Sequence, residues 1–277
     1  MSNYIEYNDE IAFHPGYYIK ELVDASGLTQ EDFAKRLGTT PKNLSVLIKG
    51  EQSLSIDIAG KLSRMFGNSI SFWLNIQQAY DEKRAQFLNE QELMREREVF
   101  RMIDYSYFRD NFDFPNLPRK TDEQIKLVRE FLSVASLTVL QDRNLCANLL
   151  NCPSEPTLAN IINANIMMQI AINSVVCTEA TKFNRRKFER TVARIFQQTE
   201  FHKEFLPELK QAFCDAGVVI VVLPNLRDSA VNGATKKVDG KVLLMINDRR
   251  RSTTSLWGAL FNEAKHIVDG NMGISFS

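Results

Sequence analysis

Residues 28–48, LTQEDFAKRLGTTPKNLSVLI, carry the signals for two short helices joined by a tight turn. Thr29 is a good N-cap for the first helix, and the acidic residues that follow it favour the positive end of the helix dipole. Gly38 can end this helix because glycine adopts a positive φ without a steric cost. Ala34 is small where a second helix must approach closely, and Pro41 suits the first turn of that helix. The stretch predicts a helix-turn-helix.

The second of these helices, which Thr39 or Thr40 can cap, has one apolar and one polar face. Leu44, Leu47 and Ile48 repeat at helical spacing and predict the inward face. The outward face carries amide, hydroxyl and amino groups suited to base edges and phosphates: Thr40, Lys42, Asn43, Ser45 and Lys49. The pattern favours a DNA-binding motif, and the alternative is a purely structural helical hairpin.

The charge of this region limits how it can bind DNA. Residues 1–85 contain nine Lys and Arg against eleven Asp and Glu. A slightly acidic domain has no broad basic field, so binding has to depend on local placement of cations and on dimerisation.

The segment from Phe13 to Tyr80 resembles the HigA-type antitoxins, a branch of the Xre-like regulators. The resemblance lies in HPGYYIKELVDASGLTQEDFAKRLG and GNSISFWLNIQQAYD. It implies a lambda-repressor-like domain of five helices that dimerises, binds a palindromic operator and represses its own promoter, often together with a toxin. It also implies that Gln30 caps its helix against a phosphate while Lys42, Asn43 and Ser45 read or grip the groove. Phe72, Trp73 and Ile76 have helical spacing and are expected in the core, or in the dimer interface that the family implies.

The whole composition is that of an ordinary globular protein. The 277 residues are 44% hydrophobic and 25% charged, with a formal net charge of zero. The four cysteines, Cys146, Cys152, Cys177 and Cys214, have no metal-binding spacing, which favours reduced thiols in a cytoplasmic protein. The N-terminus lacks the pattern of a signal peptide. Leu158–Val176 is apolar but contains four asparagines and a glutamine, so we expect a buried helix and no contact with a membrane.

Three parts are expected along the chain: residues 1–85 as the helix-turn-helix domain, 86–120 as a charged helical connector, and 121–277 as a helical region leading into a small domain. A helix is expected from Thr121 through Leu140, and helical structure from Pro156 to Phe213. Within the latter, a basic stripe is expected to be a solvated face, with nucleic-acid contact as the alternative; it contains Arg185, Arg186, Lys187, Arg190 and Arg194.

The pattern changes near residue 218. VVIVVLP from Val218 and KVLLMIND from Lys241 are short apolar runs that predict two strands of a small sheet. A helix is expected from about Thr254, ending at Asp269 and Gly270. The chain is therefore expected to be mainly α, with a small α+β region at its C-terminus.

The last helix contains an incomplete metal motif. Glu263 and His266 take the second and fifth places of an HExxH pattern, in which two histidines hold zinc and the glutamate activates water, but the first place is Asn262. The region from Pro156 onward resembles the ImmA/IrrE metallo-endopeptidases, a zincin-type fold, whose motif would have histidine at 262 and a small residue in place of Lys265. Family members normally continue past this helix to supply another ligand, whereas this sequence ends at Ser277. We expect Glu263 and His266 to be vestigial and no cofactor to be bound.

These patterns together predict a dimeric, sequence-specific transcriptional regulator, of the autorepressing antitoxin type, joined to an inactive peptidase-like sensory or scaffold domain. Operator DNA and a second copy are the expected partners, with a toxin protein as a further one. One alternative is an ImmA/IrrE-type zinc endopeptidase that cleaves a repressor or toxin and binds zinc. The other is an interaction protein that neutralises a toxin and has no operator.

Overall fold

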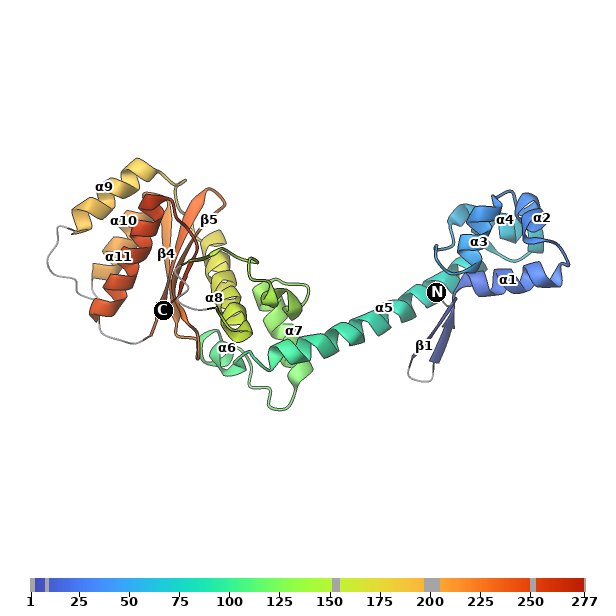
Figure 1. Cartoon of the computed structure of the whole chain (residues 1–277), viewed down its shortest axis with the longest axis horizontal. Coiled ribbons are helices and arrows are strands. Elements are labelled where there is room, and N and C mark those ends of the chain that lie inside the picture. Colours follow the sequence, from blue (N-terminus) through green and yellow to red (C-terminus); the bar gives the residue numbers. More distant parts are fainter. Residues whose placement is uncertain (1–2, 8–9, 151–154, 197–204, 250–252, 277) are drawn as a thin grey trace. The chain divides into compact units, whose positions relative to one another are not determined.

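The computed structural model describes residues 3–7, 10–150, 155–196, 205–249 and 253–276. The chain divides into two compact units, Met1–Leu93 and Met94–Ser277, which we call unit 1 and unit 2 (Figure 1). A long helix, α5 (Ile70–Phe100), begins in unit 1 and ends in unit 2.

Unit 1 is a bundle of helices preceded by a β-hairpin. Its elements are β1 (Tyr4–Tyr7), β2 (Glu10–Phe13), α1 (Pro15–Ala25), α2 (Gln30–Leu37), α3 (Pro41–Ile48), α4 (Ile56–Phe66) and the first part of α5. The expected helix-turn-helix is α2 and α3. The antiparallel hairpin was not expected from the sequence. Trp73 is 2% exposed in the core whereas Phe72 is 47% exposed, so the two neighbours have different surroundings.

The core of unit 1 depends on a close approach between α1 and α3. Gly16, in the first turn of α1, lies so near α3 that an added Cβ would stand 2.0 Å from the carbonyl oxygen of Leu47. His14, the N-cap of α1, is buried, and its Nδ1 accepts the amide of Gly16 at 3.0 Å. The His14 ring meets Tyr80 of α5 edge-on, with 5.0 Å between centroids. One histidine therefore joins the start of α1 to α5.

Unit 2 is a five-stranded sheet with helices on both faces. The sheet order is β3-β7-β5-β6-β4, in which β5 is antiparallel to β6 and β7 while the pairs β4–β6 and β3–β7 are parallel. Helix α8 covers one face, and α10 and α11 cover the other (Figure 1). The strands are β3 (Leu149–Leu150), β4 (Val218–Pro224), β5 (Val231–Val238), β6 (Lys241–Asp248) and β7 (Ile274–Phe276). The helices are α6 (Tyr105–Asn111), α7 (Thr121–Leu132), the 3-10 helix η1 (Leu137–Gln141), α8 (Leu158–Val176), α9 (Arg185–Phe196), α10 (Leu206–Cys214) and α11 (Thr253–Asp269).

Several expectations for unit 2 were wrong in detail. The helix from Thr121 ends at Leu132 because Ser133 takes a left-handed conformation, with φ of 55°, and only a 3-10 turn follows. The helical structure expected over 156–213 is confirmed, and in the described part of that stretch it consists of three helices, α8, α9 and α10. Strands β4 and β6 are confirmed, but the sheet also contains β3, β5 and β7, which the two apolar runs did not predict. The expected last helix is confirmed as α11, and Gly270 follows it with φ of 77°.

Helix α8 is buried against the sheet. It is the one helix among the described residues that is long and apolar enough to cross a membrane, and 56% of its apolar window is buried inside the protein. Its packing against β4, β5 and β6 is that of a core helix. Cys146, Cys177 and Cys214 are free thiols, and Cys152 lies outside the described residues.

Candidate nucleic-acid interface

Local hydrogen bonds fix the two helices of the motif. Thr29 caps α2, its Oγ1 accepting the amide of Asp32 at 3.2 Å. Gly38 ends α2 with φ of 69°, a left-handed conformation that favours glycine. Thr40 then caps α3, its Oγ1 accepting the amide of Asn43 at 3.2 Å. The capping residues expected from the sequence are confirmed, and α3 therefore begins at Pro41.

The structure places most, but not all, of the expected contact residues on the open surface. Gln30 is exposed at the first position of α2, and Lys42, Asn43 and Lys49 are exposed along α3. Ser45 is only half-buried, so its hydroxyl is less accessible than the pattern suggested. Thr40 is exposed, but its oxygen already accepts the capping bond.

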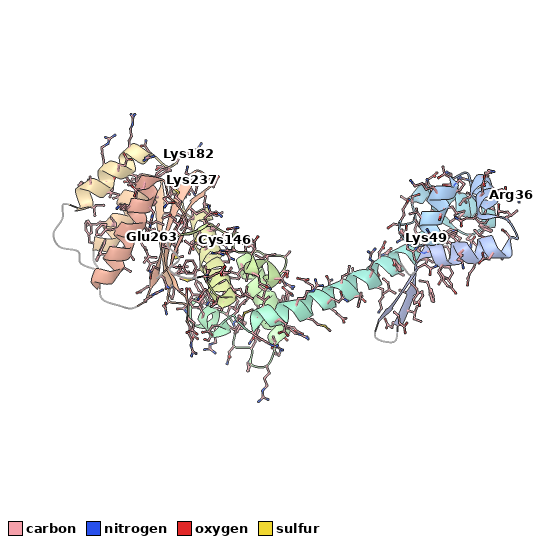
Figure 2. The ribbon with its side chains drawn as sticks, viewed as in Figure 1. Arg36, Lys49, Cys146, Lys182, Lys237 and Glu263 are labelled. Atoms are coloured by element: carbon pink, nitrogen blue, oxygen red, sulfur yellow. The ribbon has the colours of Figure 1, made fainter. Side chains whose placement is uncertain are left out.

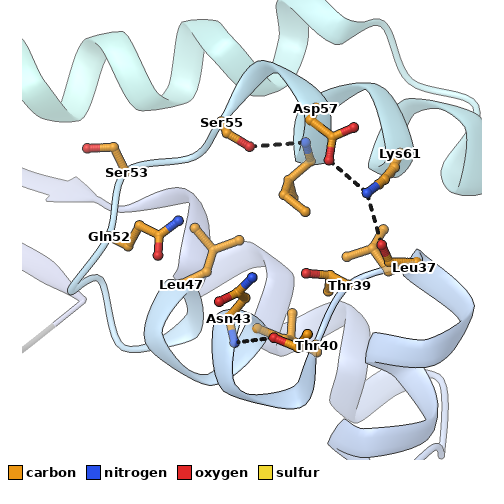
Figure 3. Close-up of a pocket in the computed structure, with 13 residues that line it drawn as sticks. Leu37, Thr39, Thr40, Asn43, Leu47, Gln52, Ser53, Ser55, Asp57 and Lys61 are labelled. Carbon is orange, nitrogen blue, oxygen red and sulfur yellow. Dashed lines mark hydrogen bonds and ion pairs between the residues drawn. The ribbon is translucent and has the colours of Figure 1, made fainter.

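Helical geometry divides these residues between two sides of α3. Lys42 and Lys49 are seven residues apart, close to two turns, and project from one side. Asn43 points about 100° away from Lys42 and lines a pocket of about 400 Å³ between α3 and the start of α4 (Figure 3). The polar side chains of this pocket include Thr39, Gln52 and Ser53. The open surface of α3 therefore offers cations on one side and neutral hydrogen-bonding groups on the other.

The cations of α3 have no acidic partners. Neither Lys42 nor Lys49 forms an ion pair with any described residue (Figure 2 labels Lys49). Other lysines of unit 1 are neutralised: Lys35 pairs with Glu31 at 2.9 Å, and Lys83 pairs with Glu10. Local placement thus leaves positive charge on α3 although the domain as a whole is slightly acidic.

The side of the pocket opposite Asn43, which Lys61 forms, was not predicted from the sequence. Lys61 of α4 donates to the carbonyl of Gly38 at 2.9 Å and pairs with Asp57 at 2.7 Å (Figure 3). It satisfies a free carbonyl at the end of α2 and holds α4 against the turn. The i,i+4 spacing of Asp57 and Lys61 was a visible signal for their pairing, but the contact with Gly38 depends on the tertiary fold.

The incomplete metal motif lies on α11 in unit 2. Asn262 Nδ2 lies 3.4 Å from His266 Nε2, as the spacing of one turn requires. Glu263 is 1% exposed and packs on β5, where its Cγ would be 2.7 Å from a Cβ added at Gly233. Burial raises the pKa of Glu263 to about 7, and the neighbouring Ser275 hydroxyl offsets part of that shift.

These residues do not fit a catalytic zinc ion. Such a site usually has three protein ligands from His, Asp, Glu or Cys. Among the residues that the structure describes, no three side chains of these types come together. Asn262 supplies a neutral amide where a histidine would be needed, and the buried Glu263 carboxyl packs against Gly233 of β5.

Comparison with known proteins gives matches to unit 1. A family model described as helix-turn-helix matches residues 19–73. Virulence-associated protein I of Dichelobacter nodosus is 34% identical over 80 residues, 28% of this chain and 74% of that protein. The uncharacterized HTH-type transcriptional regulator YddM of Escherichia coli is 33% identical over 72 residues, 26% of this chain and 77% of that protein. A solved HigA-family addiction module antidote protein from Coxiella burnetii is 29% identical, with 30% of this chain and 92% of that chain covered and a TM-score of 0.28.

The matched residues contain α2 and α3 in full, together with the caps described above. The chain belongs to the Xre-type helix-turn-helix family of DNA-binding regulators.

Proposed function

We propose that this protein is a sequence-specific transcriptional regulator of the antitoxin type that represses its own promoter. The observation that carries the proposal is the open face of α3, where Lys42 and Lys49 have no acidic partner among the described residues and Asn43 is exposed. A relative named as a transcriptional regulator and a structure named as a HigA-family antidote protein are consistent with it. The cytoplasm is the compartment in which this function would be carried out.

Each side chain has a chemical role in the proposed complex. The Asn43 amide both donates and accepts, so it can pair with the major-groove edge of adenine. Lys42 and Lys49 can neutralise phosphates along one side of the groove, and Gln30 at the start of α2 can hold a further phosphate. Base reading is therefore assigned to Asn43, and positioning to the cations and Gln30. Thr40 and Ser45 contribute less in this proposal, because one is engaged as a cap and the other is half-buried.

We propose a homodimer as the active species. The end of α4 and the start of α5 carry large apolar side chains on the surface, exposed by 36% to 47%: Met65, Phe66, Ile70 and Phe72. Removing such a patch from water favours association. A dimer also doubles the number of phosphate contacts, which compensates for the low net charge of unit 1.

Footprinting of the DNA upstream of the gene tests the proposal. The wild-type protein should protect an inverted repeat whose half-sites are about 34 Å apart, one helical turn. Asn43→Ala should relax the base preference at one or two positions in each half-site. A protein that protects no site but co-purifies with a toxin encoded beside it would instead support the toxin-neutralising alternative.

For unit 2 we propose an ImmA/IrrE-like scaffold that no longer acts as a peptidase. The supporting observation is the placement of α11 on β5, with Glu263 at the contact and Asn262 in place of the first ligand. Purified protein should contain far less than one zinc per chain, and Asn262→His alone should give weak uptake at most. Stoichiometric zinc, with cleavage of a repressor or toxin that Glu263→Gln abolishes, would support the endopeptidase alternative.

A further inference from the structure

A second pocket lies in unit 2, away from the α3 face. It has a volume of about 530 Å³, within the range of small-molecule sites, and is formed where β5, the end of α11 and the segment before α9 meet. Hydrogen bonds hold its walls. The amide of Phe183 donates to the carbonyl of Gly240 at 2.8 Å, and the amide of Thr235 donates to the carbonyl of Gly273 at 2.8 Å. The pocket is therefore built into the fold.

The charged groups of the pocket all have the same sign. Arg185, Lys236 and Lys237 line it, and no Asp or Glu does. Lys236 donates to the carbonyl of Cys146, a neutral partner. Arg185 is partly neutralised by Glu189, at 2.9 Å.

Lys237 is exposed, and no carboxylate among the described residues pairs with it. Lys182 adds another cation close by (Figure 2). Its side chain lies against Gly240, in the turn after β5, where an added Cβ would be 3.8 Å from Lys182 Cγ. Positive charge without acidic partners in a concave site attracts an anion.

The rest of the lining is apolar. Phe183, Ile267 and Met272 contribute to it, and Ile267 is 1% exposed. A small inorganic ion would leave Phe183 and Met272, which are half-buried, in contact with water. A ligand that carries both an anionic group and a short apolar group would use both parts of the pocket.

We propose that this pocket binds a small organic anion, with a carboxylate or phosphate group at Lys237, beside the positive charge of Arg185, and an apolar portion against Phe183 and Met272. The proposed DNA binding uses none of these residues. The proposal for this pocket and the proposal for the α3 surface are therefore tested independently.

Isothermal titration calorimetry of the full chain with octanoate, octan-1-ol and acetate tests the proposal. Octanoate has both features, octan-1-ol lacks the charge and acetate lacks the chain. Octanoate should bind with one site per chain and more tightly than either of the others. Octyl phosphate is a fourth probe, and its affinity relative to that of octanoate shows whether a phosphate or a carboxylate binds more tightly. Saturable binding of either octanoate or octyl phosphate supports the site.

Charge-matched variants locate the binding. Lys237→Gln should weaken octanoate roughly three- to fivefold, the size expected for one partly exposed ion pair, and Lys237→Arg should retain binding. Lys210→Gln, an exposed lysine of α10 outside the pocket, is the control and should bind as wild type. Absence of binding by both octanoate and octyl phosphate, equal affinity for octan-1-ol, or equal affinities in the Lys237→Gln and Lys210→Gln proteins would overturn the proposal.

Discussion

Glycine has opposite roles at two positions of unit 1. Gly16 is required because an added Cβ would stand 2.0 Å from a backbone oxygen of Leu47. Gly60, in the interior of α4, has room: an added Cβ would meet Arg64 and Ile70 at 3.8 and 3.9 Å, which is ordinary contact. The sequence alone does not distinguish these two glycines, since the difference depends on how closely α1 approaches α3.

Alanine at these two positions should therefore change stability in opposite directions. Gly16→Ala should lower the free energy of unfolding of unit 1 by about 2–3 kcal/mol, because a backbone contact cannot yield without moving a helix. Gly60→Ala should raise it by about 0.5–1 kcal/mol through its effect on the unfolded chain. Urea unfolding followed by Trp73 fluorescence in a Trp257→Phe background measures both. Equal effects of the two substitutions would show that the close approach of α1 to α3 is wrong.

At the scale of elements, the sequence predicted what depends on local signals. The caps Thr29, Gly38 and Thr40 are confirmed because capping involves atoms only two or three residues apart. The apolar runs of β4 and β6 are confirmed because strands buried on both faces are apolar throughout. The hairpin β1–β2 and the strand β5, which have mixed composition, are among the strands that were not predicted. Strand β5 contains a glycine and two lysines, and its pairing with β6 and β7 is fixed by tertiary contacts.

The candidate site was predictable to a similar extent. The position of Lys42, Asn43 and Lys49 on an open face followed from the helical period. The half-buried state of Ser45 depends on the tertiary fold, and the place of Lys61 in the pocket beside Asn43 depends on where α4 lies.

The cap of α1 makes the stability of unit 1 depend on pH. Burial lowers the pKa of His14 below 6.5, partly opposed by Asp81. Nδ1 must be unprotonated to accept the Gly16 amide. The unfolded chain therefore binds a proton at higher pH than the folded one does, and stability should be lost as pH falls below about 6.5. His14→Asn keeps a capping oxygen and should make unit 1 less stable but less sensitive to pH between 7.5 and 5.5.

The same Trp73 unfolding measurement tests this expectation. His266→Gln, which alters a histidine of unit 2, should leave the pH dependence of unit 1 as in the wild type. A His14→Asn protein that loses as much stability on acidification as the wild type would contradict the role given to this histidine.

At the scale of the whole molecule, the chain combines two units with separate cores. The core of unit 1 is formed by α1 to α5, and that of unit 2 by the sheet and its helices. We expect a fragment of residues 1–93 to fold and dimerise alone. Phe72→Lys should make it monomeric at micromolar concentration, because a charge replaces an exposed apolar side chain in the proposed interface. Leu88→Lys, another exposed apolar residue of α5, is the control in sedimentation velocity. A wild-type fragment that sediments as a monomer would contradict the proposed dimer.

The salt dependence of operator binding by the full chain tests whether α3 is the DNA-binding surface. Fluorescence anisotropy with the protected DNA should give a linear fall of log affinity with log salt. Lys42→Ala and Lys49→Ala should each weaken binding and reduce the magnitude of that slope by about two, because each substitution removes one phosphate contact from each protomer of the proposed dimer. Lys20→Ala, an exposed lysine of α1, should change neither. Affinities and slopes that are the same for Lys42→Ala, Lys49→Ala and Lys20→Ala would contradict the assignment of α3 as the DNA-binding surface.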